Sequence, residues 1–93
     1  MSRLARDVAA LRPRETVVCY VEDGRRVLGT CASVERDQSG ARVFLCPVDA
    51  SSVPFQLRAT RTGDGWRQPF VERWNDDAEC WERYGDVADV ETQ

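Results

Sequence analysis

Apolar, β-branched and aromatic residues recur in short runs through the middle of the chain, and turn-forming residues separate them. Val, Thr, Tyr and Phe favour strands, whereas Gly, Asp and Pro between the runs favour turns. The pattern predicts five short strands, at residues 16–21, 27–34, 42–46, 55–60 and 66–71. Five short, strongly bent strands cannot make a two-sheet sandwich with a thick core, so we expect them to curl into a small barrel.

Two glycines and one proline indicate how this predicted sheet bends. Asp23-Gly24 lies between the first two strands, where Asp-Gly is a strong hairpin signal that requires a positive φ at the glycine. Gly29 interrupts the second strand, as is typical of a bulge or a sharp bend. Pro69 lies inside the fifth predicted strand, which we therefore expect to be an edge strand or a broken one.

Helical periodicity is confined to the two ends of the chain. Residues 2–12 predict a short helix capped by Ser2 and ended by the following proline, with an apolar stripe formed by Leu4, Val8 and Leu11. A second short helix is predicted at residues 78–84, after a capping cluster that begins at Asn75 and before Gly85 as the residue that ends it.

The composition is that of a soluble globular chain, but its charge is unevenly divided. The 93 residues are 42% hydrophobic and 31% charged, and the chain shows no apolar run of membrane-spanning length and no signal peptide. Residues 1–68 carry 11 Arg against 8 acidic residues, a net +3, whereas residues 69–93 carry 2 Arg against 8 acidic residues, a net −6. We therefore expect a cytoplasmic, single-domain protein with a mildly basic body and an acidic tail.

The inventory of reactive side chains argues against catalysis. His and Lys are absent, so all 13 positive charges are Arg, and the commonest general base and metal ligand is missing. The four cysteines show no Cys-x-x-Cys spacing: Cys19, Cys31, Cys46 and Cys80. Buried free thiols are the favoured interpretation, with a disulfide or an intermolecular metal site as the alternatives. We predict no catalytic residue, no bound metal and no cofactor.

One segment resembles a known family. Residues 17–35 contain a strand, an Asp-Gly-Arg hairpin at Gly24, a further Gly29 five residues later and the apolar-acidic pair Val34-Glu35. This arrangement resembles the first conserved segment of the Sm-like (LSm) proteins, and with the preceding helix the likeness covers residues 2–46. Gln38-Ser39-Gly40 stands where that family has its RNA-contacting Asn. The resemblance implies a ring-forming, RNA-binding barrel. The same stretch is more weakly similar to PRC-barrel and SH3-like proteins.

Pattern and resemblance together predict a mainly β fold. It is a small five-stranded SH3-like or Sm-like barrel with a short N-terminal helix and a short C-terminal helix. Residues 1–71 are expected to form the N-terminal helix and the barrel, and residues 72–93 an acidic helical tail packed on that barrel. Docking of the tail is expected because a barrel of this size has little core of its own.

Two sets of residues are candidates for binding. The first is a group of arginines near the hairpins that suits phosphates or bases: Arg25, Arg26, Arg42, Arg58 and Arg61. A solvated face balanced by nearby acidic residues is the alternative interpretation of this group. The second set is aromatic, lies in the acidic tail and is expected to contact either the barrel or a partner: Trp74, Trp81 and Tyr84.

These features favour a non-enzymatic binding module. The leading hypothesis is an Sm-like protein that acts as a homo-oligomer and binds RNA, with exposed strand edges as the route to assembly. The alternative is a protein-protein interaction or regulatory module, such as an inhibitor of a nucleic-acid-handling complex, that uses its acidic tail. An accessory subunit of a larger enzyme is a third class. No contact with a membrane is expected.

Overall fold

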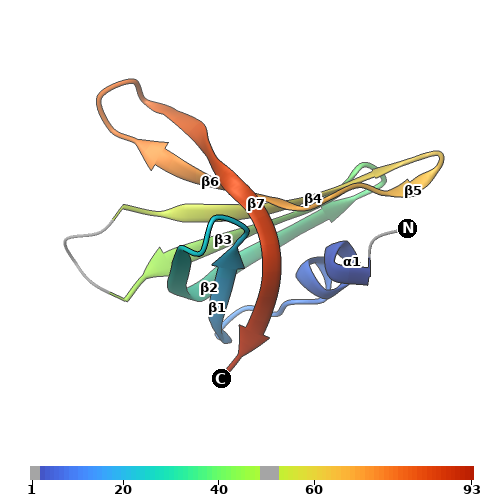
Figure 1. Cartoon of the computed structure of the whole chain (residues 1–93), viewed down its shortest axis with the longest axis horizontal. Coiled ribbons are helices and arrows are strands. Elements are labelled where there is room, and N and C mark those ends of the chain that lie inside the picture. Colours follow the sequence, from blue (N-terminus) through green and yellow to red (C-terminus); the bar gives the residue numbers. More distant parts are fainter. Residues whose placement is uncertain (1–2, 49–52) are drawn as a thin grey trace.

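Seven strands and one helix make up most of residues 3–48 and 53–93, which are the residues that the computed structural model describes (Figure 1). In chain order the elements are α1 (Arg3–Ala9), β1 (Thr16–Val21), β2 (Arg26–Asp37), β3 (Gly40–Pro47), β4 (Phe55–Thr62), β5 (Gly65–Trp66), β6 (Phe70–Asn75) and β7 (Cys80–Thr92). The first four predicted strands are confirmed, and so is the N-terminal helix, although α1 ends earlier than expected. The predicted cap, Ser2, lies outside the described residues.

Six of the strands close into an antiparallel barrel. The hydrogen-bonded order runs β1-β2-β3-β4-β6-β7, and β7 pairs with β1 to complete the circle. The two-residue β5 adds only a short hairpin to β4. This architecture is consistent with small barrels of the Sm-like or SH3-like kind. Because every one of the six strands has two neighbours, the expected exposed barrel edges are confined to strand ends, such as residues 80–83 of β7, which pair with β6 alone.

The predicted C-terminal helix is wrong, because residues 80–92 form strand β7 and residues 76–79 form a turn. The side-chain Oδ1 of Asn75 accepts hydrogen bonds from the backbone N–H groups of Asp77 (2.9 Å) and Ala78 (3.1 Å), as a helix cap would. Glu79 then adopts φ 52°, which reverses the chain direction and lets Cys80 pair with Asn75. The capping signal is therefore real, but it closes a hairpin.

Strand β7 bends sharply so that one end pairs with β6 and the other with β1. The pairing partner changes between Asp86 and Val87, next to Gly85, which the sequence pattern assigned to a helix end. A Cβ atom there would lie 2.5 Å from Cγ1 of Val21, so only glycine lets the two strands approach this closely. The register shifts once beside Val71 and again beside Tyr20, and such bulges increase the bend of a strand.

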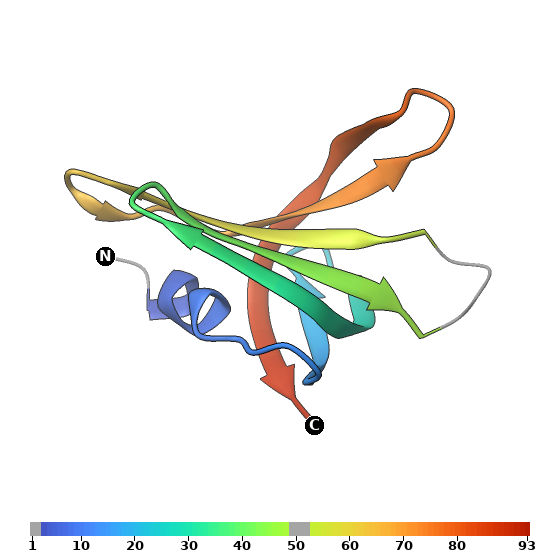
Figure 2. The same ribbon diagram turned by 180° about the vertical axis from the view of Figure 1, so that it is seen from behind.

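The fifth predicted strand is divided in two. Residues 65–66 form β5 and residues 70–75 belong to β6, with Pro69 in the connection between them. Proline lacks the N–H that a ladder needs, so the break falls where the sequence indicated that the strand could not continue. Both views show the β6–β7 hairpin projecting beyond the rest of the barrel (Figures 1 and 2).

The core is small and aliphatic. Alternate residues of the strands point inward, and α1 packs against β3, β4 and β7. The fully or almost fully buried residues include Val8, Val17, Cys19, Val43, Leu45, Leu57, Val71 and Val87. The predicted positive φ at Gly24 is confirmed at 95°, and the hairpin that contains it joins β1 to β2. The barrel wall therefore presents its outward-facing residues on a framework fixed by this core.

Candidate functional site

The five predicted arginines do not form one surface, because the barrel distributes them over three places. Arg42 and Arg58 face each other across the β3–β4 pair. Arg25 and Arg26 belong to the β1–β2 hairpin, and Arg61 lies at the far end of β4, with its guanidinium 5.9 Å from the centre of the Trp66 ring. The five arginines that the sequence grouped together therefore occupy three places: the β3–β4 pair, the β1–β2 hairpin and the end of β4.

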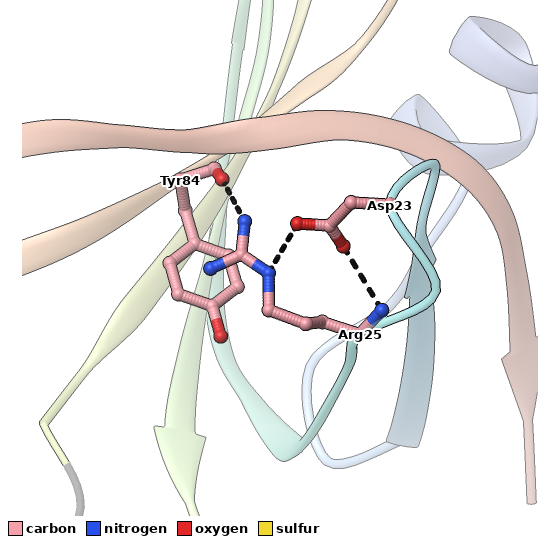
Figure 3. Close-up of polar contacts among 3 residues, drawn as sticks. All are labelled: Asp23, Arg25 and Tyr84. Atoms are coloured by element: carbon pink, nitrogen blue, oxygen red, sulfur yellow. Dashed lines mark hydrogen bonds and ion pairs between the residues drawn. The ribbon is translucent and has the colours of Figure 1, made fainter.

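Arg25 is bound by its own chain (Figure 3). Its guanidinium forms an ion pair with Asp23, donates a hydrogen bond of 2.6 Å from Nη2 to the carbonyl oxygen of Tyr84, and lies 3.8 Å from the centre of the Tyr84 ring. Tyr84 stands between the pairs Val71–Gly85 and Glu72–Arg83 and has no opposite residue. We call Asp23, Arg25 and Tyr84 the latch, because they tie the β1–β2 turn to the bend of β7.

The latch also changes the chemistry of its carboxylate. The backbone N–H of Arg25 donates a hydrogen bond of 2.9 Å to Asp23, and this bond, helped by the guanidinium, lowers the pKa of Asp23 below its ordinary value. The predicted partner-binding residue Tyr84 also packs against the core, and its ring meets that of Phe55 edge-on with ring centres 5.2 Å apart. Both Arg25 and Tyr84 therefore have structural roles.

Arg42 and Arg58 are in a different position. They are directly opposite each other on neighbouring strands, and Glu35 of β2 is directly opposite Arg42 on its other side. Like charges in directly opposite positions destabilise a sheet. Arg58 is 3.5 Å from Oε1 of Glu72, whereas Arg42 forms no ion pair within the described part of the chain and lies 5.9 Å from the centre of the Phe44 ring. Arg42 therefore has charged neighbours, Glu35 across the strand pair and Asp37 in the adjoining turn, but no close ion pair among the described residues.

A pocket of about 300 Å³ lies beside this pair, on the outer face of β2, β3 and β4. Its walls include Glu35, Asp37, Arg42, Arg58 and Thr60. We call it the arginine pocket. The acidic and glycine residues in it were not predicted as site residues, because their placement depends on strand register that no local pattern contains.

The turn at one end of the arginine pocket is built by Asp37. Its carboxylate accepts hydrogen bonds from the hydroxyl (2.6 Å) and the backbone N–H (2.7 Å) of Ser39, which lower the pKa of Asp37. Gly40 follows at φ 140°, and a Cβ atom there would lie 2.0 Å from the carbonyl oxygen of Ala59. The close approach of β3 and β4 beneath the pocket therefore requires glycine.

The predicted aromatic set is only partly brought together. Trp74 and Trp81 oppose each other on the β6–β7 hairpin with ring centres 5.4 Å apart, and Trp81 lies 6.3 Å from Phe44. The two tryptophans are half-buried, while Tyr84 belongs to the latch. We call Phe44, Trp74 and Trp81 the aromatic cluster.

The aromatic cluster adjoins a buried polar residue that the sequence pattern did not single out. Gln56 lies between Phe44 and Glu72 in the strand register and is 2% exposed. Its amide nitrogen donates a 2.6 Å hydrogen bond to Glu72, while its Oε1 has no hydrogen-bond partner among the described residues. Alternation along β4 would have assigned Gln56 to solvent, and only the neighbouring strands bury it.

The cysteines divide into two kinds. Cys19 and Cys31 are buried, Cys46 and Cys80 are exposed, and all four are free thiols. Burial raises the pKa of Cys19 to about 12 and also raises the pKa of Cys31, which disfavours the reactive thiolate. Residues 3–48 and 53–93 contain no group of three or more His, Cys, Asp or Glu side chains placed to hold a metal ion.

Residues 3–48 and 53–93 contain no helix that is long and apolar enough to cross a membrane. Comparisons with protein-family models, with curated proteins and with solved structures give no match.

Proposed function

We propose that this protein is a non-enzymatic module that binds single-stranded RNA on the outer face of β3 and β4. The observation that carries the proposal is the Arg42–Arg58 pair, two guanidinium groups directly opposite each other beside a pocket. The pairing costs the fold free energy. A phosphate or a base edge that accepts hydrogen bonds from both groups would offset that cost.

The surroundings of the pair suit a single strand better than a duplex. The guanidinium groups of Arg42 and Arg58 lie near the rings of Phe44 and Phe70, at 5.9 and 5.8 Å. Single-stranded RNA is recognised by stacking of splayed bases on aromatic rings and guanidinium planes, and the face offers both. The likeness of residues 2–46 to the Sm-like proteins supports the same proposal, and self-association would then use the edge of residues 80–83.

A second candidate function rests on the aromatic cluster. Phe44, Trp74 and Trp81 are half-buried and gather beside an acidic hairpin tip that contains Asp76 and Asp77. Tryptophan is enriched at the centres of protein-protein interfaces. A regulatory module that docks a basic protein partner on this hairpin is therefore the alternative proposal.

Fluorescence anisotropy with a labelled oligouridine tests the RNA proposal. We expect binding at low salt that weakens with a log–log slope of about −1.4, since each phosphate neutralised on a single strand contributes about −0.7 and two arginines are involved. Arg42→Gln and Arg58→Gln should each lower the affinity about tenfold. Arg26→Gln is the matched control, because Arg26 is exposed on β2 away from the pocket.

Two results would overturn the RNA proposal. One is the absence of binding by the unmodified protein at low salt. The other is an equal loss of affinity in Arg26→Gln and in the two pocket variants, because general charge and not this face would then be responsible.

A further inference from the structure

We propose that the arginine pocket selects a guanine base. This inference rests on the proposed RNA function and names what the same site recognises. It starts from the mixed charge of the pocket, where the carboxylates of Glu35 and Asp37 share the walls with Arg42 and Arg58. A phosphate alone would meet two carboxylates, and a cation alone would meet two guanidinium groups. A neutral ring with hydrogen-bond donors on one edge and acceptors on the next suits both the carboxylates and the guanidinium groups.

Glu35 and Arg42 are the two charged groups of the pocket wall whose side chains make no hydrogen bond or ion pair among the described residues. They are directly opposite on β2 and β3, yet they form no ion pair with each other. Asp37 is committed to Ser39, and Arg58 is partly committed to Glu72. The free pair therefore consists of one group that only accepts hydrogen bonds and one that only donates them.

Guanine uses this pair more fully than the other bases do. Its N1–H and N2–H groups are adjacent donors that one carboxylate accepts together, and its O6 and N7 are adjacent acceptors that one guanidinium reaches together. Adenine, cytosine and uracil have no edge with two adjacent donors, so the carboxylate makes at most one strong bond to them. The pocket volume of about 300 Å³ is at the lower end of small-ligand sites and suits a single base.

The test compares oligouridines in which one central residue is replaced by guanosine, adenosine or cytidine. We expect the guanosine strand to bind about tenfold more tightly than the others, as a good bidentate base contact provides. Glu35→Gln should abolish this preference, measured as the ratio of the affinities for the guanosine strand and for plain oligouridine, because the new amide N–H₂ group opposes the donors of guanine. Glu22→Gln is the control with the same change of charge at an exposed site outside the pocket.

A second variant separates charge from geometry. Arg42→Lys keeps the positive charge but replaces the planar fork by a point charge that cannot bond O6 and N7 together. We expect the ratio of its affinities for the guanosine strand and for plain oligouridine to fall to about one, although the positive charge is retained. Retention of the full preference in Arg42→Lys and in Glu35→Gln would overturn the inference.

The remaining outcomes distinguish this inference from the function on which it rests. If every strand binds equally, the guanine inference is wrong and the RNA proposal stands. If no strand binds, the RNA proposal fails, and guanosine monophosphate is then titrated alone. Binding of that nucleotide, lost in Glu35→Gln, would assign the pocket to a free guanine nucleotide, whereas no binding would reject the guanine inference as well.

Discussion

Arg25 and Arg42 carry the same side chain on the same barrel, and the two regions around them use it in opposite ways. In the latch, Arg25 has a carboxylate, a carbonyl oxygen and an aromatic ring as partners. In the arginine pocket, Arg42 has a second arginine directly opposite and no ion pair among the described residues. The guanidinium of Arg25, whose hydrogen bonds are made within the chain, holds the structure together. The guanidinium of Arg42, which lies opposite a like charge, has donors left for an external partner.

The cause of the difference lies in the strand geometry around each arginine. The bulge at Tyr84 leaves a residue without an opposite partner, and Arg25 extends from a turn to reach its carbonyl oxygen. Arg42 and Arg58 lie instead in a regular ladder, where the register fixes them side by side. The bulge thus leaves the carbonyl oxygen of Tyr84 available to Arg25. In the regular ladder around Arg42, the strands use the backbone carbonyl groups for their own pairing.

Deleting residues 80–93 should have the largest effect, because it removes β7 and with it the latch. The barrel would open between β6 and β1 and expose buried residues such as Val17 and Val71. We expect no cooperative thermal transition by circular dichroism. A deletion of the last residue, Gln93, serves as the control. A truncated chain that still melts cooperatively would show that β7 and the latch are not required for the fold.

Gly40→Ala should be the most damaging single substitution in the arginine pocket. The new Cβ atom would lie 2.0 Å from the carbonyl oxygen of Ala59, at a backbone φ of 140°. Strain and overpacking together should lower the free energy of unfolding by about 3 kcal/mol, measured by urea denaturation. Gly63→Ala is the control, since a Cβ atom there has no neighbour within 4 Å. Equal stability of the two variants would contradict the close approach of β3 and β4.

Arg25→Gln should lower stability, whereas Arg42→Gln should leave it nearly unchanged. Loss of the latch contacts, which are partly exposed, should lower the free energy of unfolding by about 1 kcal/mol. Loss of the Arg42 charge removes the repulsion from Arg58 but also the attraction to Glu35, which lies directly opposite on the other side, so the two effects should nearly cancel. Urea denaturation of both variants under the same conditions measures the contrast. Two destabilised variants would mean that Arg42 also has a structural role.

The smallest expected effect is on the loss of stability at low pH. The pKa values of Asp23 in the latch and Asp37 beside the pocket are lowered by hydrogen bonds from Arg25 and Ser39. A carboxyl whose pKa is lower in the folded state stabilises it above the ordinary value and loses that contribution as the pH falls through the folded value. Melting temperatures should therefore fall below about pH 4.

Asp23→Asn and Asp37→Asn should each make that decline shallower. Glu22→Gln is the control, since its side chain is exposed and accepts no hydrogen bond among the described residues. A decline of unchanged steepness in both Asn variants would show that these two turns do not contribute to the acid sensitivity.

Local pattern was sufficient for the parts of the fold that local geometry determines. Alternation and turn residues predicted four strands, the α1 helix and the positive φ of Gly24. Strand β7 was missed because residues 80–92 are acidic, alternate weakly and contain Gly85, which also fits a helix end. Its strand character comes from pairing with β1, some seventy positions away in the chain, and no local signal reports such a contact.

The candidate site shows the same division between local and long-range information. Arg42 and Arg58 were among the predicted arginines, since residue type alone suggests anion or base contacts. The register of β2, β3 and β4 brings these two arginines together and places Glu35 beside them. Tyr84 packs against the core and is separated from Trp74 and Trp81 because strand residues three apart lie on opposite faces, which a helical interpretation of residues 78–84 does not predict.

Amide chemical-shift mapping on addition of a guanosine-containing oligouridine tests the contrast between the two regions most directly. The largest shifts should fall on residues 35–42 and 58–60, which surround the arginine pocket, while residues 23–25 and 84–86 of the latch region stay unchanged. Shifts confined to the latch region or to the β6–β7 hairpin, with none at the pocket, would contradict the account.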